Sequence, residues 1–186
     1  MSTDEGLSSL REENLPFHRV IKYADYKAFE TAAVQGQLNQ FETVIFDDLT
    51  ELADIFLFEE KPKHKNLQQA YGKLNDEMLR VIKLWRSFTN FKVVFLCKQE
   101  RVKDEMTGGM IYGPNIPGKA IPQMLPYLVG NVYNSFLWTN PENPNAAPIP
   151  CLRCRRDNQY DAKDRSGKLD PVEPFNLAHI FAKQAS

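Results

Sequence analysis

The sequence contains no uninterrupted run of roughly 18 apolar residues, the length that a membrane-spanning helix requires. Its first residues have neither the basic segment nor the apolar core of a secretory signal. Only three cysteines occur among 186 residues, which is too few for a disulfide-based scaffold. These absences predict a protein that does not associate with membranes and works in a reducing, cytoplasmic compartment.

An excess of positive charge is also missing. The formal net charge is −1 at pH 7, with 23 Lys and Arg against 24 Asp and Glu. This balance excludes a uniformly basic nucleic-acid-binding protein but permits a local basic surface. The composition is that of an ordinary globular chain, and the length predicts a single domain over residues 1–186.

Apolar patterns predict an α/β fold. Residues 41–46 and 91–97 are each expected to form a buried strand, because both runs are apolar and rich in β-branched and aromatic side chains. Between them, Asn66 precedes apolar residues at three-to-four spacing, which predicts a long helix capped by that asparagine. A helix between two such strands predicts a mainly parallel sheet with covered faces.

The rest of the chain completes this outline. Residues 17–21 predict a short strand, and Asp25 is expected to cap the helix that follows. Residues 98–120 are polar and rich in glycine, which predicts a long loop. Strands over 132–138 and 149–155 are expected to form a hairpin, and a last helix is expected over residues 175–183.

Asp47 is the first candidate for chemistry. It follows the apolar residues 43–46 and precedes a second carboxylate, Asp48. A parallel sheet would place this acid at the carboxyl edge of a buried strand, as in the Walker B element of P-loop ATPases, where it binds Mg²⁺ beside a phosphate. An alternative is that these aspartates only cap a helix starting near Thr50. The pattern leaves both interpretations open.

One segment, residues 113–119, has the spacing of a phosphate-binding loop, but its residues do not suit that role. Ala120 stands where a hydroxyl side chain would bind Mg²⁺, and no buried strand leads into Gly113. Pro114 and Pro117 also remove two backbone amides that would bind phosphate. We therefore do not interpret this segment as a Walker A loop.

Two further patterns involve a pair of cysteines and a basic segment. Cys151 and Cys154 have the spacing of half a zinc site, but no second cysteine pair exists, so they are expected to be small residues of the hairpin. The predicted loop holds four candidate DNA-binding residues. Arg101, Lys103 and Lys119 would contact a phosphodiester backbone, and Tyr112 would stack on a base. A solvated surface loop is the alternative.

In this order, the motifs resemble those of phage nucleotide-binding proteins, which are RecA-like ATPases of recombination cassettes that also encode single-strand annealing proteins. The matching segments cover nearly the whole chain and are residues 3–11, 43–52, 71–78, 100–105, 112–120 and 162–167. The resemblance implies a three-layer RecA-like P-loop NTPase core with a mainly parallel sheet, followed by a C-terminal β-hairpin and helix.

The resemblance also implies roles for individual residues. Glu5 would orient the water that attacks ATP. Asp47, with Asp48 beside it, would bind the Mg²⁺ of the nucleotide. Gln99, or its neighbour Lys98, would connect the γ-phosphate to the DNA-binding loop.

Further implied roles concern partners. Lys163 and Arg165 would reach the nucleotide of a neighbouring subunit and stabilise charge in the transition state. The protein would assemble with itself into a ring or filament, bind single-stranded DNA, and act beside an annealing protein in the cytoplasm of a bacterial host.

Relatives carry a Gly-rich loop ending in Lys-Thr or Lys-Ser before the counterpart of Glu5, and residues 1–186 contain no such loop. The chain is therefore expected to be N-terminally truncated, so that its own binding of ATP and Mg²⁺ is an open question. Three hypotheses follow: a DNA-dependent ATPase, an inactive DNA- or partner-binding remnant, and a subunit that supplies Lys163 and Arg165 in trans to an intact ATPase.

Overall fold

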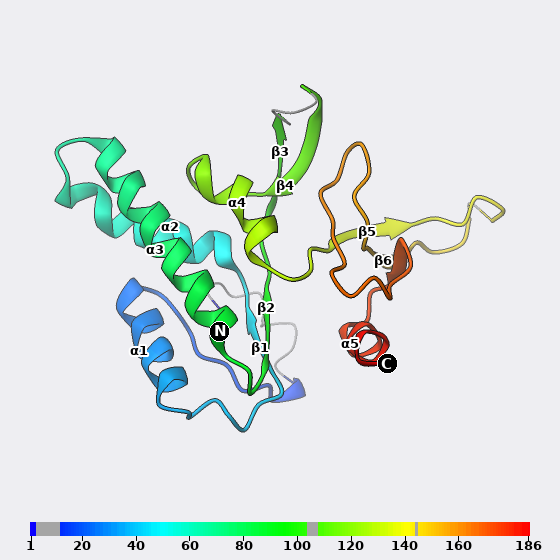
Figure 1. The fold of residues 1–186 in the computed structure, drawn as a ribbon, viewed down its shortest axis with the longest axis horizontal. Helices are drawn as coiled ribbons and strands as arrows, with labels where there is room; N and C mark the ends of the chain where they lie inside the picture. The colour runs from blue at the N-terminus through cyan, green and yellow to red at the C-terminus, as the bar shows by residue number, and fades with distance from the viewer. Residues whose placement is uncertain (3–11, 104–107, 144) are drawn as a thin grey trace. The chain divides into compact units, whose positions relative to one another are not determined.

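The computed structural model describes residues 1–2, 12–103, 108–143 and 145–186 (Figure 1). They form two compact units, described separately: Met1–Gln99 with Pro114–Gln123, and Glu100–Gly113 with Met124–Ser186. The first contains α1 (Tyr23–Val34), β1 (Thr43–Phe46), α2 (Leu49–Glu60), the short 3-10 helix η2 (Lys61–Lys63), α3 (Leu67–Ser87) and β2 (Lys92–Phe95). Next come β3 (Gln99–Lys103), β4 (Met110–Pro114), α4 (Ala120–Leu128), β5 (Asn134–Trp138), β6 (Ile149–Arg153), β7 (Val172–Pro174) and α5 (Leu177–Ala185).

The predicted parallel pairing of the two apolar strands is confirmed. β1 and β2 are parallel, with Thr43 opposite Lys92 and Phe46 opposite Phe95. Ser2 adds parallel bridges to Arg19 and to Asp47. The strand predicted over residues 17–21 is thus reduced to the bridge at Arg19, since its neighbours form no further ladder in the described structure.

The long helix is also confirmed. Asn66 caps α3, since its side chain accepts a hydrogen bond from Gln68 N at 2.9 Å. The apolar stripe of α3 is buried and comprises Ala70, Leu74, Met78, Val81, Ile82 and Trp85. Figure 1 shows α2 and α3 running side by side, and the two helices contact each other. Burial of one apolar face explains why a helix with a polar opposite face is stable here.

The prediction that Asp25 is the N-cap of α1 is wrong, because Asp25 lies three residues after the observed N-cap, Lys22. The helix begins at Tyr23 after Lys22, so Asp25 lies in its first turn. The carboxylate of Asp25 accepts hydrogen bonds from the N–H groups of Ile21 and Lys22, both at 3.0 Å. It therefore stabilises the helix start by reaching backward instead of standing at the cap.

An aromatic cluster fixes β1 against the helices. Trp85 is fully buried, stacks on Phe29 with ring centroids 5.3 Å apart, and meets Phe46 edge-on at 4.7 Å. Its indole N–H donates to the hydroxyl of Tyr26 at 3.1 Å. Because Phe46 immediately precedes Asp47, this packing holds the end of β1 in place.

A buried polar network joins α1 to α3. Glu30 is 7% exposed and accepts hydrogen bonds from Tyr26 Oη and Arg80 Nη2, both at 2.6 Å. Arg80 also donates to Glu77, from Nη2 at 2.7 Å and from Nε at 2.9 Å. Each charged group thus has a charged partner, which offsets the cost of removing it from water.

Acid is expected to destabilise the protein through this network. Burial raises the pKa of Glu30, but hydrogen bonds from Arg80 and Lys27 outweigh burial and hold the pKa below the ordinary value of 4.5. The unfolded state then binds more protons below that pH. The stabilising contribution is therefore complete above pH 4.5 and is lost as the pH falls through the lowered pKa.

Denaturant unfolding at several pH values measures this effect. Glu30→Gln should lower the free energy of unfolding at pH 7 by about 1–3 kcal/mol and flatten its dependence on acid. Glu42→Gln, at an exposed position before β1, is the matched control. Equal acid sensitivity in Glu30→Gln and the unmodified protein would contradict this role.

In the second unit, β5 and β6 form the predicted antiparallel hairpin, with Asn134 opposite Arg153 and Trp138 opposite Ile149. β7 extends it to a three-stranded sheet by pairing with β6. Leu152, Cys154, Leu169 and Ile180 form the buried core beneath α5. The prediction that both cysteines lie on a hairpin strand is confirmed for Cys151, which belongs to β6, whereas Cys154 follows the end of that strand; both are buried.

Residues 98–120 do not form the long loop that their composition predicts. They contain β3 and β4, which pair as a two-stranded sheet, and then the start of α4. The fold is therefore mixed α/β, with small parallel and antiparallel sheets, and a three-layer core stays a prediction. In the part of the chain that the structure describes, no helix is both long and apolar enough to cross a membrane.

Candidate functional site

The carboxyl ends of β1 and β2 meet at one edge of the parallel sheet. Leu96 N donates to Phe46 O at 2.9 Å, and Leu49 N donates to Leu96 O at 2.8 Å. These bonds hold the residues after each strand together, so that Asp47 and Asp48 share an edge with Lys98. The parallel arrangement that brings these strand ends to one edge was predicted from the strand–helix–strand pattern, and the structure confirms it for β1 and β2.

Asp47 is held at this edge by the segment that begins the chain. Its N–H donates to Met1 O at 3.0 Å, and the Met1 ammonium donates to Ile45 O at 2.9 Å. Burial lowers the pKa of that ammonium, while the carboxylate of Asp47 raises it. The Asp47 side chain is half-buried, and the peptide bond between it and Asp48 is cis.

Asp48 caps α2. Its Oδ1 accepts a hydrogen bond from Glu51 N at 2.7 Å, so this carboxylate fixes the first turn of the helix. Of the two interpretations left open by the sequence, capping thus applies to Asp48. Asp47 is not needed for it, which favours a chemical role for Asp47; a nucleotide-binding role of Asp48 stays a prediction.

Lys98 connects the edge to the segment that follows β2. Its ammonium forms an ion pair with Glu51, and this hydrogen bond raises its pKa. Its N–H donates to Thr50 Oγ1 at 3.0 Å, and its carbonyl accepts from Asn115 N at 2.8 Å. Gln99 follows as the exposed first residue of β3.

Sequence reasoning missed Thr50, which is 3% exposed. Its buried hydroxyl fixes the backbone of Lys98, a residue 48 positions along the chain. A polar residue within the apolar pattern of α2 was the only available signal. Asp54, one turn further, has a pKa raised by burial and, to a smaller extent, by the nearby carboxylate of Glu51, while Lys98 lowers it.

The residues of this edge fit the metal of a nucleotide better than its phosphates. Mg²⁺ commonly takes one or two carboxylates and completes its shell with water and phosphate oxygens. Within the described residues no cluster of three or more His, Cys, Asp or Glu would hold a metal alone. Asp47 suits such a shared ion, whereas the acids Asp48 and Glu51 make the start of α2 unsuitable for phosphate.

Residues 113–119 do not provide a phosphate cradle either. Asn115 N donates a hydrogen bond to Lys98 O, and Ile116 is 1% exposed, so residues 114–119 are packed within the first unit. Gly118 has a φ of +95° and lies against α3, where a Cβ would come within 3.5 Å of Asn75. This packing agrees with the sequence-based rejection of a Walker A loop.

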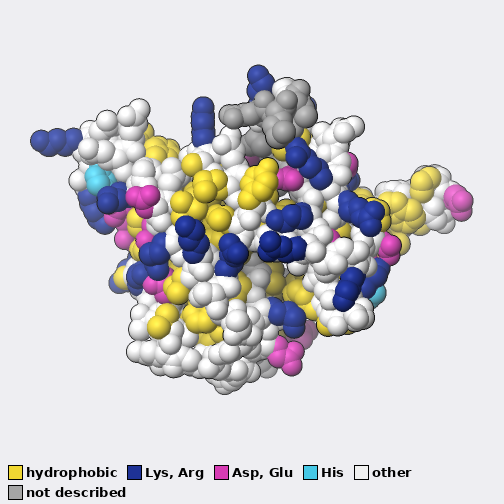
Figure 2. All heavy atoms as spheres, viewed as in Figure 1, with side chains coloured by type: hydrophobic (Ala, Val, Ile, Leu, Met, Phe, Trp, Pro, Cys, Tyr) yellow, Lys and Arg dark blue, Asp and Glu magenta, His cyan; other side chains and the backbone are white. Residues whose placement is uncertain are grey.

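The candidate DNA-binding residues fall in different surroundings. Arg101 and Lys103 are exposed at alternate positions of β3, and Lys119 is exposed in the first unit. Tyr112 stacks on Tyr160, with centroids 4.9 Å apart and planes 13° apart. One face of the Tyr112 ring is therefore covered, and its stacking on a base stays a prediction. Figure 2 shows exposed Lys and Arg side chains on the viewed face.

Tyr160 also belongs to a cation–π stack in the second unit. The guanidinium of Arg153 lies 4.2 Å from the centroid of Tyr160 and 5.1 Å from that of Phe136. Arg153 is paired with Asp157 as well. This stack ties β4 to the β5–β6 hairpin, because Tyr112 N also donates to Gln159 O at 2.6 Å.

Lys163 and Arg165 differ sharply. The ammonium of Lys163 donates to Pro126 O at 2.5 Å and to Val129 O at 2.8 Å, at the carboxyl end of α4. Arg165 is exposed on a loop, and its backbone N–H donates to Asn131 Oδ1 at 3.0 Å. Lys163 is thus engaged in its own unit, and its catalytic role stays a prediction, whereas Arg165 is presented to solvent.

Glu5, the predicted water-orienting acid, lies outside the described residues. Asp47 belongs to the first unit and Arg165 to the second. Both residues lie within the range that a comparison with known families matches.

A family model described as an AAA domain matches residues 1–166. No curated protein and no solved structure matches the chain.

Proposed function

We propose that this chain, which belongs to the AAA-domain family, is a RecA-like phage ATPase acting in DNA recombination or single-strand annealing. Membership supports a nucleotide-binding, ATPase-like function that uses Mg²⁺. The observation that supports the proposal most is the parallel pairing of β1 and β2, which brings the residues that follow the two strands, Asp47 and Lys98 among them, to one edge of the sheet. A three-layer core with a longer parallel sheet is part of the proposal.

Asp47 would hold the Mg²⁺ of ATP at this edge, directly or through water. The ion would neutralise charge on the phosphates. Thr50 keeps the backbone of Lys98 in place, and Lys98 stands between the edge and β3. We assign the sensing of nucleotide to Lys98 or Gln99, which begins β3 and passes the change to the DNA-binding residues.

The phosphates need a cradle that residues 1–186 do not contain. We therefore propose that a Gly-rich loop outside these residues completes the site, and we call this chain together with that loop the complete assembly. Glu5 would orient the attacking water there. A second copy of the chain would supply Arg165, with Lys163 beside it, so that ATP binds between subunits of a ring or filament.

Single-stranded DNA would bind the second unit through Arg101 and Lys103, with Tyr112 contributing; Lys119, in the first unit, is a separate candidate contact. The alternation of residues 101 and 103 along β3 places both on one side of the strand, as a backbone-tracking surface requires. An annealing protein is the proposed partner in the bacterial cytoplasm.

Loss of one phosphate contact is the expected effect of Arg101→Ala or Lys103→Ala. Each should weaken binding of a labelled single-stranded oligonucleotide and reduce the slope of log K against log salt by about 0.7. Fluorescence anisotropy titrations at several salt concentrations measure this slope. Lys83→Ala, an exposed lysine of α3, is the control, and an unchanged slope in both β3 variants would contradict the assignment.

An alternative function has one observation in its favour: the sequence of residues 1–186 has no Gly-rich loop ending in Lys-Thr or Lys-Ser. The chain would then be an inactive DNA- or partner-binding remnant, or a subunit that supplies Arg165 to another ATPase. Phosphate release from ATP by the complete assembly, with and without single-stranded DNA, tests the proposal. DNA-stimulated release supports it, whereas nucleotide-independent DNA binding without release favours the alternative.

A further inference from the structure

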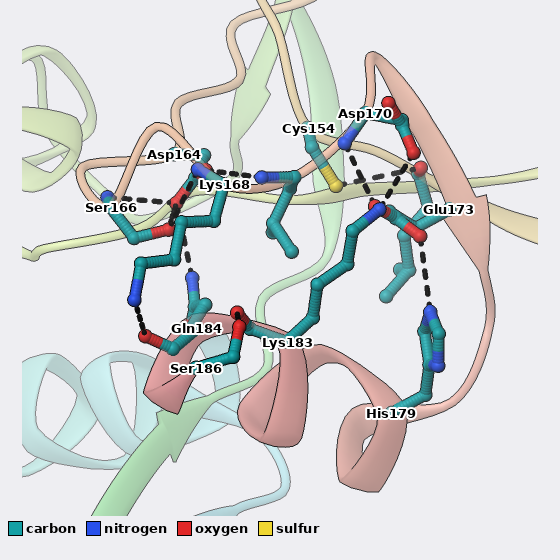
Figure 3. A network of polar contacts seen from close by, with 12 residues as sticks. Cys154, Asp164, Ser166, Lys168, Asp170, Glu173, His179, Lys183, Gln184 and Ser186 are labelled. Carbon is teal, nitrogen blue, oxygen red and sulfur yellow. Dashed lines mark hydrogen bonds and ion pairs between the residues drawn. The ribbon is translucent and has the colours of Figure 1, made fainter.

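We propose that α5, which lies beyond the residues matched by the family model, is the support that fixes the Arg165 loop, with Gln184 as the positioning residue. The inference rests on the proposed role of Arg165 in trans. The Arg165 loop is defined as residues 163–169, and Figure 3 shows its polar contacts with α5.

The loop is closed around the carboxylate of Asp164. Its Oδ1 accepts from Ser166 N at 2.9 Å and from Ser166 Oγ at 2.7 Å, and its Oδ2 accepts from Leu169 N at 3.0 Å. Gly167 has a φ of +70°, which allows the turn. Burial raises the pKa of Asp164, but these bonds lower it to about 2, so the carboxylate is ionised at neutral pH.

Gln184 of α5 joins this ring of bonds from outside. Its Nε2 donates to Asp164 Oδ1 at 3.1 Å and to Tyr133 Oη at 2.8 Å. The backbone carbonyl of Gln184 accepts a hydrogen bond from Lys168 Nζ at 3.0 Å. The helix therefore holds the loop at two points, while Asn131 holds it at Arg165 N from the other side.

The helix is itself firmly attached. Lys183 donates to Asp170 Oδ2 and to Glu173 Oε1, both at 2.6 Å, and Glu173 is 3% exposed. Ile180 is fully buried in the core of the unit. Figure 3 shows these contacts on the same helix that carries Gln184. A support that is fixed in this way transmits its own rigidity to the loop.

A fixed loop matters because a charge stabilises a transition state only when it is held in the correct place. A cation that must first be ordered loses part of its effect to the entropy of ordering. Fixing the backbone on both sides of Arg165 leaves only its side-chain torsions free. The device thus tunes turnover without contacting the nucleotide.

The test compares Gln184→Ala with Gln184→Lys, which keeps an N–H donor facing Asp164, and with Ala178→Ser, at an exposed position of α5, as control. In the complete assembly, Gln184→Ala should lower kcat about 10-fold with KM changed less than about 2-fold, and Gln184→Lys should recover part of the loss. In the chain alone, hydrogen exchange at Ser166 and Leu169 should be faster in Gln184→Ala.

Arg165→Ala is measured in parallel, so that two failures are distinguishable. If Arg165→Ala removes turnover while Gln184→Ala changes neither kcat nor exchange at the loop, the inference is wrong and the proposed function stands. If Arg165→Ala leaves turnover unchanged, the role of Arg165 in trans is wrong and this inference falls with it. Equal loss of kcat and of folded protein in Gln184→Ala would also overturn it.

Discussion

Arg165→Ala is expected to reduce ATP turnover by the complete assembly at least about 10³-fold, while nucleotide binding changes little. The reason is geometric. Arg165 is exposed on a loop tied down by Asp164 and Asn131, so its guanidinium is free to reach outward while its backbone is fixed. A charge that acts only on the transition state affects kcat and leaves ground-state affinity almost unchanged.

Phosphate release and binding of a fluorescent ATP analogue measure the two quantities separately. Arg165→Lys should recover only a small part of turnover, because an ammonium lacks the planar, bidentate geometry of a guanidinium. Arg86→Ala, at an exposed position of α3, is the matched control. Loss of analogue binding in step with turnover would show instead that Arg165 contributes to binding within its own unit.

Mixing provides a second arm of this experiment. If Arg165 acts in trans, turnover-dead Arg165→Ala chains mixed with turnover-dead Asp47→Asn chains should recover part of the activity. Some interfaces between the two kinds of chain then combine the intact Asp47 of one with the intact Arg165 of the other. No recovery over a range of mixing ratios would contradict action between subunits.

Asp47→Asn is expected to reduce turnover about 10²- to 10³-fold and to weaken the binding of the Mg²⁺ that activity requires. The substitution keeps the size of the side chain and the backbone bond to Met1 O, and it removes the charge that would hold the ion. Titration of activity against Mg²⁺ should therefore show a raised half-saturating concentration as well as a lower maximum.

Asp48→Asn separates the charge of Asp47 from that of its neighbour. Asparagine caps helices about as well as aspartate, so α2 should remain intact and the free energy of unfolding should change little. If Asp48 acts mainly as a cap, Asp48→Asn should affect turnover much less than Asp47→Asn. An equal loss would assign the metal to both carboxylates.

The parts of the fold that periodicity determines could be predicted from sequence. The structure confirms the burial of the apolar stripe of α3 and the parallel pairing of β1 with β2. The expectation that both strands are fully buried is wrong: Ile45 of β1 is 40% exposed, and the residues of β2 are exposed or half-buried. The β5–β6 pairing follows from alternation in the same way. These elements depend on local hydrophobic order, which a single sequence displays directly.

Other parts depend on contacts that no local pattern displays. Residues 98–120 looked like a loop because their side chains are polar, yet backbone pairing forms β3 and β4 without an apolar stripe. β7 spans only Val172–Pro174 and exists because β6 offers it an edge. Tertiary context outweighs composition in both cases.

The candidate site shows the same division. The position of Asp47 after a buried strand was readable, because strand and edge are adjacent in sequence. The capping role of Asp48 was one of two open interpretations, and the link from Thr50 to Lys98 crosses 48 residues, so only the fold reveals it. Likewise, the binding of Lys163 to the carbonyls of Pro126 and Val129 required knowledge of where α4 ends.

The most direct measurement is Mn²⁺ binding followed by electron paramagnetic resonance, with ATP present and absent, for the complete assembly and its Asp47→Asn variant. The account predicts that the protein retains Mn²⁺ only when ATP is bound, and that Asp47→Asn loses at least about tenfold in this affinity. Equal Mn²⁺ affinity in the unmodified assembly and in Asp47→Asn with ATP present would contradict it.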